Sequence, residues 1–166
     1  MDYASRGQFD LYRRYPNVAV MRTLSKIGFA ALRVGWLVAH PELIGGLNKV
    51  RQPYNLSGVS QRLATLVLDD FSDQVADVVR RVVRERERVA AAIDALDGFE
   101  VAPGQANFSW VRTERPAGDV QSHLAERGIL VRSFHSCGGR LAHQLRITVG
   151  TQAQNDTLLR ELGRVS

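Results

Sequence analysis

The sequence predicts an α/β protein built from three consecutive parts, and three observations support this. Two short apolar runs, over residues 18–21 and 34–39, lack polar alternation, which is typical of strands covered on both faces. Residues 57–96 follow a helical pattern almost throughout. Residues 97–166 return to short strands with helices between them, which is the pattern of a compact α+β unit.

The first part combines short helices with the two apolar runs. Residues 9–15 have a helical composition and end at a Pro-Asn turn. We therefore expect a helix there, followed by buried strands over 18–21 and 34–39. Pro41 favours the first turn of a short helix, and the Pro and Asn residues of 51–57 predict a loop.

The middle part predicts two helices with a break near residues 71–73. Ser57 is suited to cap the first helix, because its hydroxyl can accept a backbone N–H of the first turn. The second helix carries an apolar stripe that Arg86 interrupts. The stripe consists of Val75, Val78, Val82, Val89, Ile93 and Leu96.

The last part predicts four strands and two helices. Pro103 and Gly104 form the turn between the first two strands, and Gly128 ends the first helix. The expected strands cover 99–103, 106–111, 129–132 and 144–149, and the expected helices cover 117–127 and 152–164.

The chain of 166 residues has a net charge of +5, which raises the question of nucleic-acid binding. The densest basic run, residues 80–88, alternates arginine with glutamate inside a helical pattern. Such a run predicts a solvated helix face with ion pairs, and no aromatic stacking platform accompanies it. We therefore expect no nucleic-acid partner, although a basic nucleic-acid-binding module remains an alternative.

The cysteine content and the length of the apolar stretches indicate the cellular compartment. The single Cys137 excludes an internal disulfide and fits a reducing cytoplasm. The longest apolar stretch, residues 29–39, is interrupted by Arg33 and is too short to span a membrane. We expect no secretion, because no charged segment followed by an apolar one occurs at residues 1–16. We expect no metal site either, because His135, Cys137 and His143 do not provide four well-spaced ligands.

Lys26 stands among small and hydroxylated residues directly after an apolar run. A lysine amine that is desolvated, or close to another cation, becomes a nucleophile toward aldehydes. Thr23, Ser25 and Arg33 provide hydroxyls and a guanidinium that suit a phosphate oxyanion. Together these groups suggest pyridoxal 5'-phosphate as a cofactor, whereas Lys26 alone would favour a solvated loop residue.

The stretch from Thr23 to Gly35 resembles the lysine motif of the fold-type I pyridoxal-phosphate aminotransferases, and is most similar to that of the histidinol-phosphate aminotransferases. The resemblance implies that Lys26 is the catalytic Schiff-base lysine. It also implies that Thr23, Ser25 and Arg33 hold the cofactor phosphate. By the same resemblance, residues 1–72 are the carboxyl-terminal part of the cofactor-binding large domain, 73–96 a linking helix and 97–166 the small domain.

Two arginines interrupt apolar strands in the last part, where a charge needs an ionic partner such as a bound anion. Residues 144–151 resemble the family's Leu-Arg-Ile-Thr-Val-Gly-Thr motif, which implies that Arg146 binds the anionic end of the substrate. The resemblance gives Arg132 a role in phosphate binding. It also makes Tyr54 and Asn55 substrate-site candidates near a partner subunit. Structural ion pairs and a simple turn are the alternatives for these residues.

The resemblance implies a cytoplasmic, homodimeric transaminase of histidine biosynthesis. Its reaction converts L-histidinol phosphate and 2-oxoglutarate to imidazole acetol phosphate and glutamate, and Lys26 moves the proton. The match is to the later part of the family only, so the acidic residue that contacts the pyridine nitrogen is expected upstream. We therefore expect little or no transaminase activity from the isolated polypeptide.

Other functions stay open at this point. The chain could be a non-catalytic truncated remnant or an interaction module that uses exposed core surface. Within the same family, one arginine at position 146 also suits an amino-acid carboxylate, so an aromatic amino-acid transaminase is a further alternative.

Overall fold

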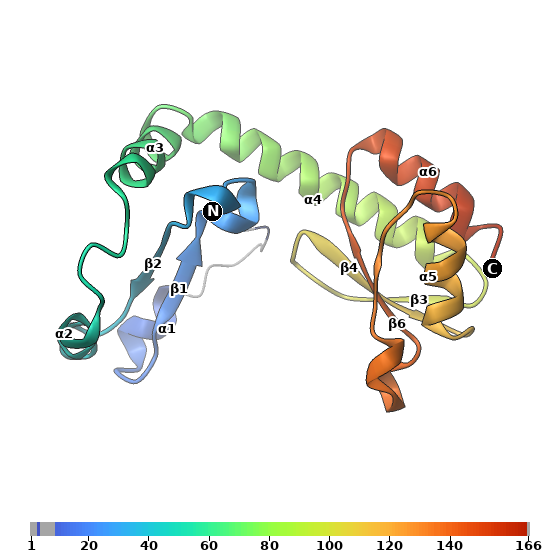
Figure 1. Cartoon of the computed structure of the whole chain (residues 1–166), viewed down its shortest axis with the longest axis horizontal. Coiled ribbons are helices and arrows are strands. Elements are labelled where there is room, and N and C mark those ends of the chain that lie inside the picture. The colour runs from blue at the N-terminus through green and yellow to red at the C-terminus, as the bar shows by residue number, and fades with distance from the viewer. Residues whose placement is uncertain (1–2, 4–8, 166) are drawn as a thin grey trace. The chain divides into compact units, whose positions relative to one another are not determined.

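The structure, a computed structural model, describes Tyr3 and residues 9–165, and the chain divides into two compact units, residues 1–79 and 80–166 (Figure 1). Helix α4, Ser72–Asp94, contributes residues to both units. Each unit combines helices with a small antiparallel sheet. This content confirms the prediction of an α/β chain.

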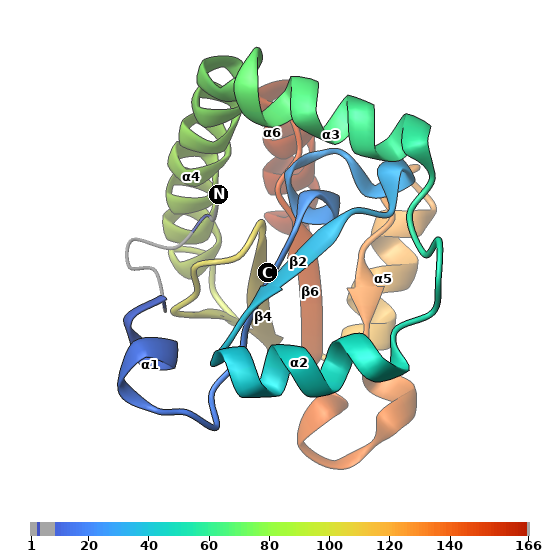
Figure 2. The same ribbon diagram turned by 90° about the vertical axis from the view of Figure 1, so that its left-hand side faces the viewer.

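The first unit is built on a hairpin whose two strands pair from Val20 with Val38 to Thr23 with Gly35. Two short 3-10 helices lie in the loop between the strands, and the irregular segment 51–57 connects two α-helices (Figure 2). The elements are α1 Phe9–Arg14, β1 Val20–Thr23, η1 Leu24–Ile27, η2 Ala30–Leu32, β2 Gly35–Val38, α2 Pro41–Val50 and α3 Gly58–Asp69.

The expectation that both apolar runs form strands covered on both faces is wrong for the described chain. Met21 is 77% exposed, and side chains along β2 alternate between exposed and half-buried. The reason is that β1 and β2 pair only with each other among the described residues, and a two-stranded ribbon has no flanking layers to cover it.

The helical predictions for the middle part are confirmed. Ser57 caps α3, with its hydroxyl accepting the Ser60 N–H at 3.1 Å. The break falls at 70–71, between α3 and α4. The core of this unit joins the hairpin loop to these helices, and it contains Leu24, Ile27, Ala64, Val67 and Val75.

The second unit is a four-stranded antiparallel sheet in the order β3-β4-β6-β5. Its core joins one face of the sheet to α4, α5 and α6 (Figure 1), and it includes Val89, Ile93, Val111, Val120, Leu124, Leu145, Ile147, Leu158 and Leu162. The elements are β3 Phe99–Ala102, β4 Phe108–Thr113, α5 Ala117–Ala125, β5 Arg132–Ser133, η3 His135–Cys137, η4 Gly139–Leu141, β6 Gln144–Thr148 and α6 Gln152–Leu162.

The predicted strand over 129–132 is wrong, because β5 covers only Arg132–Ser133. Backbone groups that a longer strand would use for pairing are hydrogen-bonded to residues of helix α5 instead. Ile129 N–H donates to the Leu124 carbonyl at 2.9 Å, and the Gln121 amide donates to the Val131 carbonyl at 3.0 Å. The apolar run therefore packs on the helix without joining the sheet.

The basic run over 80–88 is only partly the solvated face that we expected. Arg88 pairs with Glu85 at 2.9 Å and with Asp156 at 2.8 Å, as the alternating charges predict. Arg86, in contrast, is only 8% exposed and donates to the Ala106 carbonyl at 3.2 Å. The arginine in the apolar stripe therefore belongs to the interior of the second unit.

Acid is expected to destabilise the second unit through Glu85. Hydrogen bonds from Arg88 and Asn155 lower the pKa of Glu85. A carboxyl with a lowered folded-state pKa stabilises the fold above its unfolded-state pKa, and this contribution is lost as pH falls through the folded-state pKa. Glu85→Gln should therefore flatten the loss of unfolding free energy between neutral and acidic pH, measured by urea denaturation. Glu114→Gln, at an exposed position, is the control and should leave that slope unchanged.

Candidate active site

The loop between β1 and β2 is closed by backbone hydrogen bonds. Leu24 N–H donates to the Val34 carbonyl at 3.1 Å, and Phe29 N–H donates to the Leu24 carbonyl at 3.2 Å. Gly28 ends η1 with a φ of 105°, a conformation that favours glycine. The two 3-10 helices of the loop contact each other. Residues 24–34 are therefore held in a defined turn.

Gly35 explains why the motif ends in glycine. A Cβ atom at this position would lie 2.8 Å from the carbonyl oxygen of Arg22 on the paired strand. Any larger residue would push the two strands apart at the point where the loop begins. The glycine therefore fixes the position of the loop relative to the hairpin.

The two hydroxyl residues differ in what their side chains do. Thr23 Oγ1 accepts the Ser25 N–H at 3.1 Å and donates to the Val34 carbonyl at 3.2 Å, so this hydroxyl shapes the loop. Ser25 is half-buried, and its hydroxyl has no partner among the described residues. Of the two hydroxyls, that of Ser25 is the one available to a ligand.

Lys26 lies in η1 with an exposed side chain, so the described residues do not provide the desolvation that we expected. Its backbone carbonyl accepts the Tyr3 hydroxyl at 2.8 Å, which fixes the backbone without engaging the amine. No carboxylate in the described part of the chain pairs with the amine. An accessible amine of this kind can react with an aldehyde.

Arg33 completes the loop in a left-handed conformation, with a φ of 57°. Such a φ is costly for a residue with a long side chain and often marks a functional position. Its guanidinium donates to the Ala30 carbonyl at 3.1 Å, and no ion pair to it exists within the described ranges. The structure thus places Ser25, Lys26 and Arg33 on one loop, and a hydroxyl, an amine and a guanidinium are groups that suit an oxyanion.

In the second unit, the structure brings both predicted arginines together. Arg146 on β6 lies directly opposite Arg132 on β5 and opposite Trp110 on β4. All three lie on the sheet face that the core does not occupy, since their neighbours Ser133, Leu145 and Val111 are buried on the other face. Like charges placed directly opposite each other destabilise a sheet, and an anion bound between them would reduce their repulsion.

Aromatic rings surround the arginine pair. The Arg132 guanidinium lies 5.6 Å from the Phe134 ring centroid, and that of Arg146 lies 5.6 Å from the Phe108 centroid. Trp110 contacts Phe134 at a centroid distance of 4.8 Å. Neither Arg132 nor Arg146 has a carboxylate partner among the described residues. These contacts hold the guanidinium groups in place and leave their donors available.

The aromatic residues of this face were missed by the sequence analysis. Alternation along residues 108–113 places Phe108 and Trp110 on one face, which was a usable signal. The pairing of β4 with β6, however, is a long-range contact that no local pattern specifies. The aromatic surroundings of the arginines could therefore not be read from spacing alone.

The remaining candidates are not brought into either cluster. Tyr54 is 99% exposed and has a φ of 54°, and Asn55 beside it is exposed as well. Across Tyr3 and residues 9–165, no three His, Cys, Asp or Glu side chains are placed to hold a metal ion. In the same residues, none of the helices combines the length and apolarity needed to cross a membrane.

The chain is similar in sequence and structure to known proteins. A curated histidinol-phosphate aminotransferase of Roseiflexus castenholzii is 39% identical over 99% of this chain, which spans 45% of that relative. The solved histidinol-phosphate aminotransferase of Clostridium acetobutylicum superimposes on 96% of this chain with a TM-score of 0.86, at 18% identity and over 48% of its own length.

A third relative is a solved histidinol-phosphate aminotransferase from Sinorhizobium meliloti, in complex with pyridoxal-5'-phosphate. It is 26% identical with a TM-score of 0.76, over 90% of this chain and 41% of its own. The structural likenesses confirm the predicted aminotransferase fold. The sequence profile of the family described as aminotransferase class I and II matches residues 2–162. The chain therefore belongs to the aminotransferase class I and II family.

Proposed function

We propose that this chain carries the lysine loop and the small domain of a pyridoxal-phosphate-dependent histidinol-phosphate aminotransferase. The observation that carries the proposal is the loop that presents Ser25, Lys26 and Arg33 together without a carboxylate partner. The curated relative named above, a histidinol-phosphate aminotransferase, supports the choice of enzyme. The chain spans about half the length of that relative, so the activity is assigned to the whole protein.

The residues of the loop fit pyridoxal phosphate by their chemistry. When bound, this cofactor supplies an aldehyde that captures amines and a ring that stabilises negative charge on the substrate carbon. The accessible Lys26 amine would hold the cofactor through the aldehyde carbon, and after the substrate amine has replaced it, the free amine would carry the proton that moves at the substrate carbon. Ser25 Oγ and the Arg33 guanidinium donate to the phosphate, while Thr23 keeps Ser25 in position.

The arginine pair is assigned to the substrate. We propose that Arg146 binds the anionic end of the substrate and that Arg132 adds donors for a phosphate group. Tyr54 and Asn55 are assigned to the mouth of the site, near a partner subunit, by family resemblance. We also propose a cytoplasmic homodimer in which residues 1–72 belong to the cofactor-binding domain, 73–96 link and 97–166 form the small domain.

A chimera tests the proposed activity. The matched portion of the Roseiflexus castenholzii relative is replaced by this chain, and glutamate formation from 2-oxoglutarate is assayed with L-histidinol phosphate, phenylalanine or tyrosine as the donor. We expect activity with histidinol phosphate and little with the aromatic amino acids. Preference for phenylalanine or tyrosine in a folded chimera would instead establish an aromatic amino-acid transaminase. The unchanged relative and circular dichroism serve as controls.

Replacing Arg33 with asparagine is expected to stabilise the fold and to weaken cofactor binding. Asparagine tolerates the left-handed conformation, so Arg33→Asn should raise the free energy of unfolding by about 0.5–1 kcal/mol. The same change removes a charge-assisted phosphate contact and should weaken pyridoxal-phosphate binding about tenfold. Urea denaturation and a fluorescence titration measure the two effects. A loss of stability with unchanged affinity would mean that Arg33 is structural.

A further inference from the structure

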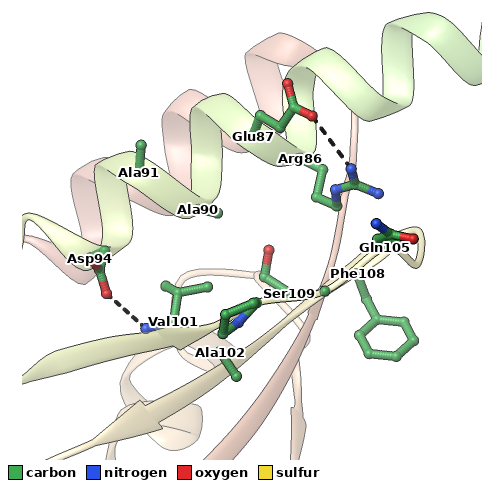
Figure 3. A pocket seen from close by; sticks show the side chains of 12 residues that line it. Arg86, Glu87, Ala90, Ala91, Asp94, Val101, Ala102, Gln105, Phe108 and Ser109 are labelled. Carbon is green, nitrogen blue, oxygen red and sulfur yellow. Dashed lines mark hydrogen bonds and ion pairs between the residues drawn. The ribbon is translucent and has the colours of Figure 1, made fainter. Parts of the chain in front are cut away.

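The second unit contains a pocket of about 460 Å³ between α4 and the β3–β4 hairpin (Figure 3). None of the residues proposed above to bind cofactor or substrate lines it, although Phe108 also contacts Arg146. The volume lies within the range of small-molecule sites. The helix contributes Arg86, Glu87, Ala90, Ala91 and Asp94, and the hairpin contributes residues 101–105 with Phe108 and Ser109.

The walls of this pocket are fixed by hydrogen bonds at both ends. At one end the Arg86 guanidinium donates to the Ala106 carbonyl at 3.2 Å. At the other end the Val101 N–H donates to Asp94 at 2.9 Å (Figure 3). Between Glu87 and Asp94 the helix presents the methyl groups of Ala90 and Ala91 to the pocket. Small side chains between two fixed ends leave the space open.

Ser109 places an unsatisfied polar group in this pocket. Its side chain lies on the face of β4 that is turned toward α4 (Figure 3), and the residue is only 4% exposed. The hydroxyl has no hydrogen-bond partner among the described residues. Leaving a buried hydroxyl unpaired is costly, and such groups in native structures usually have a partner. A ligand in the pocket would supply that partner.

Arg86 provides the positive charge of the pocket. Its guanidinium contacts Glu87 at 3.5 Å, but the Glu87 side chain is 68% exposed, so this ion pair is long and screened by solvent. A ligand carboxylate can replace Glu87 at the buried guanidinium. Asp94 keeps a second negative charge at the far end, which disfavours ligands with two anionic groups.

We propose that this pocket binds a small organic monocarboxylate with a short apolar body. The carboxylate lies between Arg86 and the Ser109 hydroxyl, which donates to it, and the apolar body lies against Ala90, Ala91 and Val101. The site does not depend on the proposed transaminase activity, since it uses none of the residues assigned to that reaction.

The test compares butyrate with its neutral isostere butyramide by NMR titration of the full chain. We expect butyrate to shift the amide signals of Ala90 and Ala91 and to bind about tenfold more tightly than butyramide. Ser109→Ala should weaken butyrate binding about tenfold without lowering the melting temperature of the free chain, because it removes an unpaired hydroxyl. Ser122→Ala, at an exposed serine of α5, is the matched control.

Replacing the buried Arg86 could prevent folding, so its role is tested through Glu87→Gln, which leaves Arg86 in place. Removing the competing carboxylate should strengthen butyrate binding about threefold. Equal binding of butyrate and butyramide would overturn the proposal. So would unchanged affinity in Ser109→Ala, or signals that shift only around Arg132 and Arg146.

Discussion

Replacing Lys26 with alanine is expected to lower the affinity of the chain for pyridoxal phosphate about a hundredfold, because the covalent bond to the cofactor aldehyde is lost. Lys26 and Lys49 are the only two lysines of the sequence, so Lys49 is the single other lysine whose replacement must be compared. Lys49 is exposed on α2, and Lys49→Ala should leave the affinity unchanged. Absorbance titration of the cofactor measures both variants.

Lys26→Arg separates covalent binding from charge. Arginine keeps the positive charge near the phosphate but does not form the bond, so its affinity should resemble that of Lys26→Ala more than that of the unchanged chain. Circular dichroism shows whether each variant is folded. Equal cofactor binding by Lys26→Ala and the unchanged chain would contradict the role of this amine.

Replacing Arg146 with glutamine is expected to weaken binding of L-histidinol phosphate about thirtyfold, since a charge-assisted contact to the anion is removed. Arg132→Gln should weaken it about tenfold, and should reduce the preference for histidinol phosphate over histidinol. Isothermal titration of the chain at two salt concentrations measures these changes. Removing either charge should also reduce the dependence of affinity on salt.

Stability distinguishes this role from a structural one. Because the two arginines are directly paired across β5 and β6, either glutamine variant should raise the free energy of unfolding in phosphate-free, low-salt buffer by about 0.2–1 kcal/mol. A structural ion pair would give the opposite sign. Arg112→Gln is the control, since Arg112 lies on the same face but pairs with Glu100 at 3.3 Å. A loss of ligand affinity in this control equal to that of Arg146→Gln would contradict the assignment.

Local signals predicted the helices well. The hydroxyl of Ser57 caps α3, and a break at 70–71, close to the predicted 71–73, separates α3 from α4, because caps and breaks depend on residues close in sequence. The strand predicted over 129–132 was wrong because its backbone groups bond to α5, which is a tertiary contact. The exposure of Met21 has a similar cause, since the apolar pattern indicated a covered sheet that β1 and β2 alone do not form.

The two residue clusters were predicted to different degrees. Lys26 and Arg33 share one loop, so their spacing was sufficient to group them. Arg132 and Arg146 were each singled out as charges in apolar runs, but their direct opposition follows from the β5–β6 register. The unpaired Ser109 hydroxyl could not be predicted, because the sequence does not show whether the hydroxyl of a serine in a strand has a hydrogen-bond partner.

The most direct test of the central claim is to incubate the chain with pyridoxal phosphate, reduce it with borohydride and map the modified peptide by mass spectrometry. The claim is that the loop closed by Leu24 and Val34 presents an amine to an aldehyde beside a phosphate site. A single adduct on Lys26 is the predicted result. An adduct mainly on Lys49, or none on either lysine, would contradict it.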